Sequence, residues 1–314
     1  MKKLYTTWAP VVAAIATILG CADEPSTSAS GDTTETAAQV VAPAGSADAD
    51  GAADTDGTAD ADGAAETTQV NKCGTVESTD MTKGKGPFTP ALIQTGGPTG
   101  KSWVFYPKEL GRDGCKHPIF NWGPGAGTGP SNYRDHLNHL ASHGFVIISQ
   151  PSSGNGSTEK PALEWLIKQN DTSSSPFYQK LDTTKVVMGG HSMGALTTFA
   201  MADFKPITHY VLVCGGSFGA PTGAQNIHGP TLILGGDTDS GTPNFDDDYA
   251  AIKTPVIFLV KNGTDHIACA RNNMEPWAAW LRWQLYGETK WKADFFAGGK
   301  YSKSPWKASR TKNF

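Results

Sequence analysis

The sequence lacks a hydrophobic run long enough to cross a bilayer. Only 38% of its 314 residues are apolar. The stretch 9–19 is nearly all apolar or small, but it is shorter than the roughly 20 residues that a membrane-spanning helix needs. A polytopic membrane protein is therefore excluded. Aromatic residues make up 10% of the chain, which is too many for a wholly disordered protein.

Residues 22–70 contain no Lys, no Arg and no aromatic residue. Eleven acidic side chains lie there among Ala, Thr, Gly and Ser: Asp23, Glu24, Asp32, Glu35, Asp48, Asp50, Asp54, Asp56, Asp60, Asp62 and Glu66. Such a segment buries too little apolar surface to offset its ordering entropy, and its like charges extend it. We expect 21–70 to be a linker that holds a folded domain, 71–314, away from a membrane.

The folded part also lacks any run of basic residues. Residues 71–314 have 24 basic and 19 acidic side chains, and this net charge of +5 is mild for their number. The pattern does not indicate binding to nucleic acid.

The first 21 residues have the features of an export signal. Lys2 and Lys3 precede the apolar stretch, which ends in Ile18-Leu19-Gly20-Cys21. This resembles the bacterial lipobox, where signal peptidase cuts before a lipid-modified cysteine. We expect 1–20 to be a signal peptide and Cys21 to carry the lipid anchor of an exported lipoprotein. The anchor holds the protein in the outer membrane or at the cell surface; release of the protein to the outside is the alternative. The alternative is an ordinary secretory signal with a chance cysteine.

Short apolar runs alternate with helical patterns after residue 100. We predict strands over 102–106, 117–122, 145–150, 185–188, 210–214, 231–234 and 256–260, and helices over 133–142, 161–169, 193–203 and 276–285. In the last helix, Trp277, Trp280 and Leu281 recur at helical spacing and are expected to pack in the core. The alternation predicts an α/β fold with a mostly parallel sheet.

The motif Gly190-His191-Ser192-Met193-Gly194 matches G-x-S-x-G between a predicted strand and a predicted helix. Glycines suit a sharp turn with a strained serine at its apex. A serine hydroxyl is a weak nucleophile at neutral pH and needs a base. We therefore predict that Ser192 is the nucleophile of a hydrolase, with an acid and a histidine following it in the chain.

The base and the acid are expected in loops that follow two later strands. His266 comes after the strand 256–260, whereas His209 stands at the start of a strand, the wrong end of the sheet. Two carboxylates, Asp237 and Asp239, follow the strand 231–234. One of them is expected to orient His266 and the other to cap the loop.

The oxyanion formed during acyl transfer needs two preorganised N–H donors. The residue after the nucleophile, Met193, supplies one backbone N–H. The glycine-rich loop 122–130 follows an early strand, and we choose Ala126 there for the second donor, with Gly125 and Gly127 as neighbours. A phosphate-binding loop is disfavoured because no Lys-Ser/Thr pair follows.

Residues 88–290 resemble the polyesterase–lipase–cutinase group of bacterial α/β hydrolases, which includes enzymes that hydrolyse poly(ethylene terephthalate). The resemblance rests on His117-Pro-Ile-Phe-Asn-Trp-Gly-Pro-Gly, Ala141-Ser-His-Gly-Phe-Val-Ile-Ile, Leu181-Asp-Thr-Thr-Lys, Gly190-His-Ser-Met-Gly, Pro230-Thr-Leu-Ile-Leu-Gly-Gly-Asp-Thr-Asp and Asp265-His266.

The resemblance implies an α/β-hydrolase fold with helices on both faces of the sheet and no large lid. It implies Asp239 as the acid, His266 as the base, and neither a metal nor a cofactor in the chemistry. The sequence departs from this group at two positions of the expected cleft. Ala126 stands where many polyester hydrolases have an aromatic residue, and the cleft tryptophan is missing from 214–218, where Phe218 is a possible substitute.

Four cysteines besides Cys21 lie in the folded part, and an even number in an exported domain favours two disulfides. Three connectivities are open. We favour Cys73–Cys115, which ties the start of the domain to the early sheet, and Cys214–Cys269. The second fastens the loop after His266, where the resembling family also has disulfides. A free, buried Cys214 is the alternative.

The sequence thus predicts a monomeric serine carboxylic-ester hydrolase that cleaves short-chain esters and polyesters through an acyl-enzyme. Met193, Phe218 and Ile267 are expected to line the acyl side. One alternative is a lipid esterase that resembles platelet-activating-factor acetylhydrolases or chlorophyllases. The other is a surface-anchored binding protein that kept the fold and lost catalysis.

Overall fold

A computed structural model describes residues 73–74, 76, 81, 86–219 and 222–314. The expected signal peptide 1–20, the lipid site at Cys21 and the linker 21–70 lie outside the described residues. None of the helices in the described part of the chain is long and apolar enough to span a membrane.

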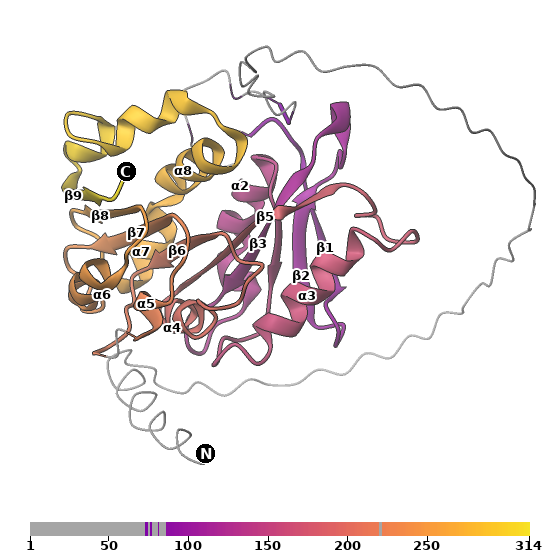
Figure 1. The fold of residues 1–314 in the computed structure, drawn as a ribbon, viewed down its shortest axis with the longest axis horizontal. Helices are drawn as coiled ribbons and strands as arrows, with labels where there is room; N and C mark the ends of the chain where they lie inside the picture. Colours follow the sequence, from indigo (N-terminus) through magenta and orange to yellow (C-terminus); the bar gives the residue numbers. More distant parts are fainter. Residues whose placement is uncertain (1–72, 75, 77–80, 82–85, 220–221) are drawn as a thin grey trace, which may run out of the picture.

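The described residues form one nine-stranded sheet with the order β1-β2-β4-β3-β5-β6-β7-β8-β9 (Figure 1). Its strands are β1 (Pro90–Gly96), β2 (Ser102–Pro107), β3 (His117–Gly123), β4 (Val146–Ser149), β5 (Leu181–His191), β6 (His209–Val213), β7 (Thr231–Gly236), β8 (Val256–Lys261) and β9 (Trp306–Lys312). The neighbours from β4 to β8 pair in parallel, and the pairs at both ends are antiparallel. The predicted α/β fold with a mostly parallel sheet is confirmed.

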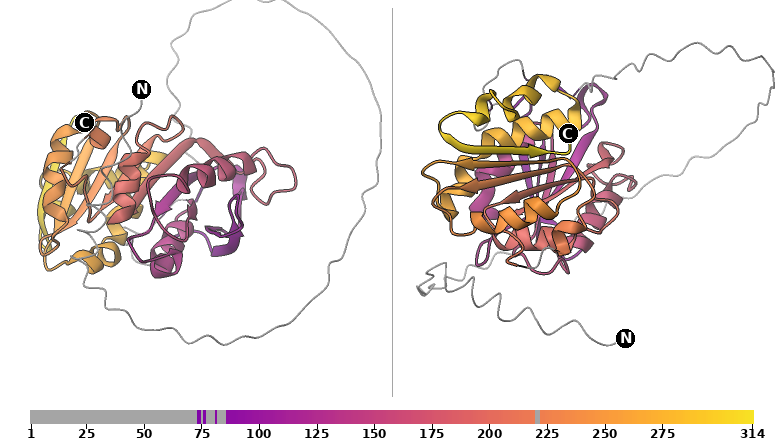
Figure 2. Two further views of the ribbon diagram at one scale, coloured as in Figure 1. Left: turned by 90° about the horizontal axis from the view of Figure 1, so that it is seen from below. Right: turned by 60° about the vertical axis from the view of Figure 1, so that its left-hand side comes forward.

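Helices cover both faces of the sheet, as Figure 2 shows. They are α2 (Arg134–Ser142), α3 (Glu159–Gln169), α4 (Met193–Ala200), α5 (Thr222–Gln225), α6 (Phe245–Ala251), α7 (His266–Asn272) and α8 (Met274–Tyr286). Short 3-10 turns lie at Arg112–Gly114, Pro130–Tyr133, Thr242–Asn244, Thr289–Phe295 and Lys300–Ser302. Helices α2 and α8 pack on one face, and α3, α4 and α6 pack on the other.

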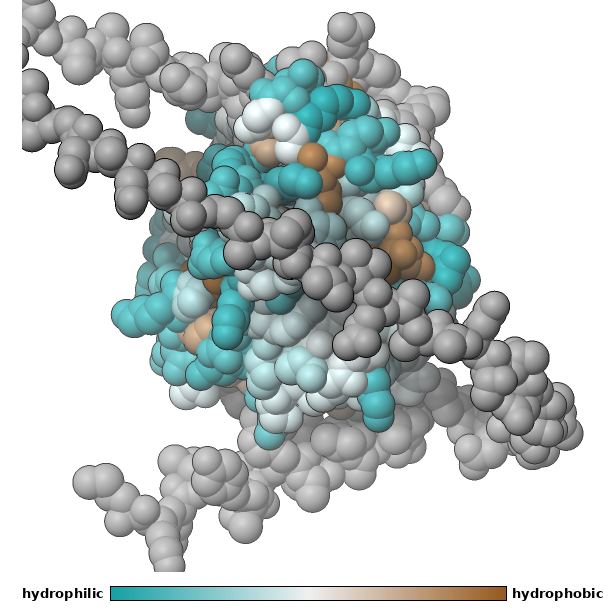
Figure 3. Space-filling view, turned by 90° about the vertical axis from the view of Figure 1, so that its right-hand side faces the viewer, coloured by the Kyte–Doolittle hydropathy of each residue, from teal (hydrophilic) through white to brown (hydrophobic). Residues whose placement is uncertain are grey.

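The edge strands β1 and β9 were absent from the sequence prediction. In β1 apolar residues stand beside Gln94 and Thr95, and no residue before Gly96 is fully buried. The strand therefore lacks the long apolar run by which the central strands were predicted. Strand β9 adds Lys307, Arg310 and Lys312 to the opposite edge. The side of the molecule that carries β1 and α3 is mostly hydrophilic, with small separate hydrophobic spots (Figure 3). Edge strands of this kind resemble loops in sequence because only part of each strand is buried.

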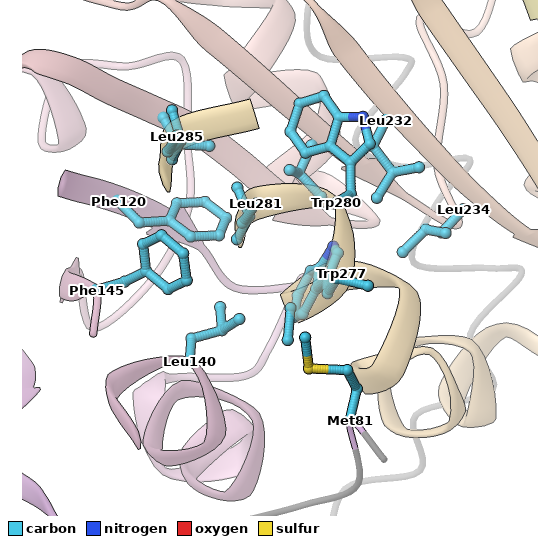
Figure 4. Packing of buried hydrophobic residues seen from close by; sticks show 14 of the residues in the cluster. Met81, Phe120, Leu140, Phe145, Leu232, Leu234, Trp277, Trp280, Leu281 and Leu285 are labelled. Atoms are coloured by element: carbon cyan, nitrogen blue, oxygen red, sulfur yellow. The ribbon is translucent and has the colours of Figure 1, made fainter. Parts of the chain in front are cut away.

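The tryptophan-rich helix α8 packs in the core, as predicted. Trp277, Trp280 and Leu281 have at most 1% of their surface exposed. The ring of Trp277 meets that of Phe120 on β3 edge to face, with centroids 6.2 Å apart, and Trp280 lies beside Leu232 of β7 (Figure 4). This packing supports the loop after β8, because that loop leads into the helix that begins at His266 and α8 directly follows it.

Two disulfides tie loops to this framework, with the favoured connectivity. Cys73–Cys115 has a Cα–Cα distance of 4.7 Å and joins the start of the described chain to the turn before β3. Cys214–Cys269 has a Cα–Cα distance of 6.2 Å and joins the end of β6 to α7. Disulfides persist outside the reducing cytoplasm, so both bonds fit an extracellular protein.

Candidate active site

Ser192 stands at a strained turn between β5 and α4. Its backbone has φ 57° and ψ −113°, a conformation that non-glycine residues rarely adopt. The turn requires glycine on both sides. A Cβ on Gly190 would lie 2.4 Å from the carbonyl carbon of Gly194, and a Cβ on Gly194 would lie 1.9 Å from the oxygen of Gly123. The motif therefore forms this turn because its glycines allow β3, β5 and α4 to approach closely.

His266 and Asp239 are hydrogen-bonded to each other. The Nδ1 of His266 donates to Oδ1 of Asp239 at 2.8 Å. Asp239 also accepts from the backbone N–H of Gly241 at 2.9 Å and from the hydroxyl of Thr242 at 2.7 Å. Burial raises the pKa of the Asp239 carboxyl, but these hydrogen bonds together hold it below its ordinary value. Asp239 is thus an ionised partner for the imidazole at neutral pH.

Asp237 has a different set of contacts. Its Oδ1 accepts from the backbone N–H of Thr264 at 3.3 Å, and its own N–H donates to the oxygen of Lys261 at 3.1 Å. Both bonds lie within the loops that follow β7 and β8. Of the two carboxylates that the sequence left open, only Asp239 reaches His266 in the described structure.

The Nε2 of His266 is buried and makes no hydrogen bond to any described residue. Ser192 and His266 line the same pocket. Catalytic hydrogen bonds are often long in a site without substrate and tighten when substrate binds. The free Nε2 therefore leaves His266 able to accept a proton at this pocket.

Two backbone N–H groups, of Met193 beside Ser192 in the chain and of Ala126 in the pocket lining, have no recorded acceptor among the described residues. Met193 is the first residue of α4, where the helix leaves its first N–H groups unpaired. Within the described part of the chain, no acceptor is recorded for the N–H of Ala126 either. The neighbouring N–H of Gly125 is used, since it donates to the hydroxyl of Tyr133 at 2.9 Å. Ala126 is therefore the better placed donor in this loop.

Tyr133 and His191 link the glycine-rich loop to the base, a connection that sequence reasoning missed. The Tyr133 hydroxyl lies 2.8 Å from Nδ1 of His191, and Nε2 of His191 lies 2.8 Å from the backbone oxygen of His266. A carbonyl can only accept, so Nε2 carries the proton and Nδ1 accepts from Tyr133. Both side chains are 4% exposed.

The pocket beside Ser192 has a volume of about 140 Å³. It is lined by residues of the glycine-rich loop, the turn at Ser192 and α7: Gly125, Ala126, Thr128, Asn132, Tyr133, His191, Ser192, His266, Ile267, Ala270 and Arg271. Ile267, an expected lining residue, is 50% exposed here. Thr128, Asn132 and Arg271 were not anticipated. Arg271 stands four residues after Ile267 on α7, a spacing that puts both on one helix face.

Met193 and Phe218 are not among the lining residues of this pocket but belong to a small apolar cluster that shares Ala126 with it. Met193 packs with Leu196, and Ala126 and Phe218 pack against this pair. The loop of Phe218 is held by Asp248, a buried carboxylate of α6 that accepts from the backbone N–H of Ser217 at 2.8 Å. Of the residues expected to line the acyl side, Ile267 lines the pocket, whereas Met193 and Phe218 belong to this apolar cluster.

The described residues contain no group of three or more His, Cys, Asp or Glu side chains that could hold a metal ion. A sequence model of PET hydrolase-like proteins matches residues 65–311. The chain belongs to the PET hydrolase-like family. No curated protein sequence matches it.

Membership of the PET hydrolase-like family agrees with the strand order and the turn at Ser192. The protein has the α/β-hydrolase fold that was expected, and the resemblance to polyester hydrolases is confirmed. The family supports an ester hydrolase of the α/β-hydrolase kind.

Proposed function

We propose that this PET hydrolase-like protein is a serine carboxylic-ester hydrolase that acts through an acyl-enzyme. The observation that carries the proposal is the 2.8 Å hydrogen bond between His266 and Asp239 beside a pocket that also contains Ser192. A nucleophile, a base and an ionised orienting group are the three parts that acyl transfer needs. They occur in the chain order of the α/β hydrolases.

In the proposed first half-reaction, Ser192 Oγ attacks the ester carbonyl while Nε2 of His266 takes the hydroxyl proton. Asp239 keeps the proton of His266 on Nδ1 and stabilises the imidazolium that forms. The N–H groups of Ala126 and Met193 stabilise the tetrahedral oxyanion. His266 then gives its proton to the leaving alcohol, and the acyl-enzyme remains.

In the second half-reaction, His266 takes a proton from a water molecule, and the resulting hydroxide attacks the acyl carbonyl. The tetrahedral intermediate collapses, the acid product leaves and the Ser192 hydroxyl is restored. Short-chain esters and polyesters are the proposed substrates, because the pocket is small and opens beside the exposed Ile267.

The test is labelling by a fluorophosphonate probe together with hydrolysis of soluble esters of increasing acyl length, a phospholipid ester and polyester films. We expect labelling and ester turnover in the wild type and neither in Ser192→Ala. Ser157→Ala is the control, because Ser157 is exposed and outside the pocket. An unlabelled, inactive wild type would favour a binding protein instead. Turnover of the phospholipid alone would favour a lipid esterase.

A further inference from the structure

The pocket beside Ser192 contains one cationic side chain and no carboxylate. Arg271 is the only charged residue among the lining residues at neutral pH, counting the imidazoles as neutral. The remaining groups are backbone, small or uncharged polar side chains and the apolar Ile267. A substrate that enters this pocket therefore meets a positive charge with no opposing acid in the wall.

The guanidinium of Arg271 has no protein counter-charge in the part of the chain that the structure describes. The ion pairs recorded there join other residues, such as Lys185 to Asp182 and Arg282 to Glu288. Arg271 itself is exposed at the last turn of α7. Its charge nevertheless acts on the hydroxyl of Tyr133, another lining residue of the pocket. Burial raises the pKa of the Tyr133 hydroxyl, and hydrogen bonds to Thr128 and Gly125 and, to a smaller extent, the positive charge of Arg271 oppose that rise.

A second donor lies on the same wall. The Oδ1 of Asn132 accepts from the backbone N–H of Gly129 at 3.0 Å. Its Nδ2 therefore carries two N–H donors, and no acceptor for them is recorded among the described residues. Asn132 is exposed and lines the pocket together with Arg271.

A small apolar cluster adjoins this pocket. Met193 and Leu196 form it, Ala126 and Phe218 pack against them, and Ala126 also lines the pocket. An ester bound next to Ser192 thus has uncharged apolar side chains near it, together with a pocket that offers a guanidinium and an amide N–H. This arrangement favours a substrate that has an apolar part and, at another end, a group that accepts hydrogen bonds from a cation.

We propose that the pocket binds a carboxylate carried by the acyl part of the substrate, so that the protein prefers half-esters of dicarboxylic acids. The inference rests on the proposed ester hydrolysis and adds a substrate class to it. Arg271 supplies two N–H groups in the planar geometry that matches a carboxylate, and Asn132 supplies a third donor. Hydrolysis releases the alcohol and leaves the dicarboxylate as the product.

A competing explanation is that Arg271 only stabilises the carboxyl end of α7 through the helix dipole. The two explanations differ in one respect. Stabilisation of the helix affects every substrate alike, whereas binding of a carboxylate affects only substrates that carry one. The ratio between two matched substrates therefore separates them.

The experiment compares the half-ester ethyl adipate with ethyl adipamate, in which an uncharged amide replaces the carboxylate. We measure kcat/KM from ethanol release at low ionic strength, for the wild type, Arg271→Gln, Arg271→Glu and the control Arg134→Gln. Arg134 is exposed on α2, where its guanidinium lies 5.2 Å from the ring of Trp103, outside the pocket.

We expect the half-ester to amide ratio to fall by about threefold to tenfold in Arg271→Gln, further in Arg271→Glu, and to stay at the wild-type value in Arg134→Gln. The effect should appear mainly in KM for the half-ester. In the wild type, added NaCl should lower the ratio, because it screens the exposed charge.

An equal ratio in the wild type and Arg271→Gln would overturn the proposal, and so would a wild-type ratio that salt leaves unchanged. Because each ratio is internal to one protein, partial loss of folded protein does not alter it. Failure of the proposed ester hydrolysis itself has a different signature, since neither substrate would then be turned over by the wild type.

Discussion

The side chain of His191, next to the nucleophile in sequence, donates a hydrogen bond to the backbone oxygen of His266 at 2.8 Å. Its other ring nitrogen accepts from Tyr133, whose hydroxyl in turn accepts from the N–H of Gly125. Burial, with a smaller contribution from the charge of His266, lowers the pKa of His191 to about 3. The imidazole is therefore neutral at working pH, and its tautomer is fixed by the two partners.

This chain of bonds predicts a loss of activity in Tyr133→Phe. Without the hydroxyl, the N–H of Gly125 and Nδ1 of His191 both lose their partner, and the loop that carries Ala126 is held less firmly. Because oxyanion donors act through their preorganised position, we expect kcat to fall about tenfold with a much smaller change in KM.

Tyr178→Phe is the matched control for this variant. Tyr178 is 38% exposed, and among the described residues its hydroxyl has one recorded partner, the Gln179 amide on the surface. We expect wild-type kinetics from it. A Tyr133→Phe variant with unchanged kcat would mean that the link between the loop and His191 has no part in positioning the donors.

The carboxylate pair after β7 offers a second prediction. Asp239→Asn removes the charge that stabilises the imidazolium of His266 and leaves an amide that can donate to Nδ1, which favours the wrong tautomer. We expect kcat to fall by about 10³-fold or more. Asp237→Asn alters only a bond to the N–H of Thr264, and we expect a change within about threefold. Steady-state kinetics of the two variants side by side would refute the assignment of the acid if their order were reversed.

The turn at Ser192 was predictable because the groups that make it lie within five residues of the sequence. Gly190 and Gly194 approach each other closely, and a short motif between a strand and a helix is enough to indicate this geometry; the approach of Gly194 to Gly123 of β3 is the one contact that the motif does not contain. The central strands were predictable for a similar reason, since burial on both faces gives continuous apolar runs. Edge strands such as β1 and β9 leave no such pattern.

The remainder of the site depends on contacts between distant segments. Asp237 and Asp239 are two residues apart after one strand, so their spacing alone does not decide which of them reaches His266; the family resemblance implied Asp239. Tyr133 and His191 are 58 residues apart, and nothing local indicates their hydrogen bond. Arg271 did have a signal. It follows Ile267 by four residues, and recognising that a helix begins at His266 would have placed both on one face.

Buried histidines predict that the fold is sensitive to acid. Burial lowers the pKa of His117, His139 and His209 to about 4 each, and it lowers that of His143 well below its ordinary value. In the unfolded chain these groups titrate near the ordinary value of about 6.5. Between those limits the unfolded state binds more protons, so the free energy of unfolding should fall as the pH drops from about 6.5 to 4.

Urea unfolding at pH 7, 6 and 5 measures this dependence, which amounts to at most about 1.4 kcal/mol per pH unit for each such group. His143→Leu should flatten it, because neither ring nitrogen of His143 has a hydrogen-bond partner among the described residues and the leucine cannot take up a proton. A protein that became more stable toward pH 5 would contradict the prediction.

The lipid anchor predicted at Cys21 is tested by Cys21→Ser. Several acyl chains bury enough CH₂ groups for stable membrane attachment, so the wild type should sediment with membranes and incorporate a labelled fatty acid. The variant should do neither, while the domain 71–314 keeps its esterase activity. Fatty-acid label on the variant, or a variant that still sediments with membranes, would speak against attachment through Cys21.

The small side chain of Ala126 leads to a prediction about the relative rates at which aliphatic and aromatic polyesters are hydrolysed. Its side chain is half-buried, packs against Met193 and Leu196, and also borders the pocket beside Ser192. An alanine there gives an aromatic ring of the substrate no partner, so flexible aliphatic polyesters should be cleaved faster than rigid aromatic ones. Stacking contributes about 0.5–1.5 kcal/mol beyond burial, which corresponds to about a twofold to tenfold change in rate.

We therefore expect Ala126→Tyr to raise product release from poly(ethylene terephthalate) relative to an aliphatic polyester by about that factor. Ala200→Tyr is the control, because Ala200 is exposed at the end of α4 and outside this pocket. It adds the same ring to the surface and so corrects for general adsorption to an aromatic polymer. If both variants raised the ratio equally, adsorption would explain it. If neither did, Ala126 would not lie beside the scissile ester, and the second oxyanion donor would have to be sought elsewhere in the loop.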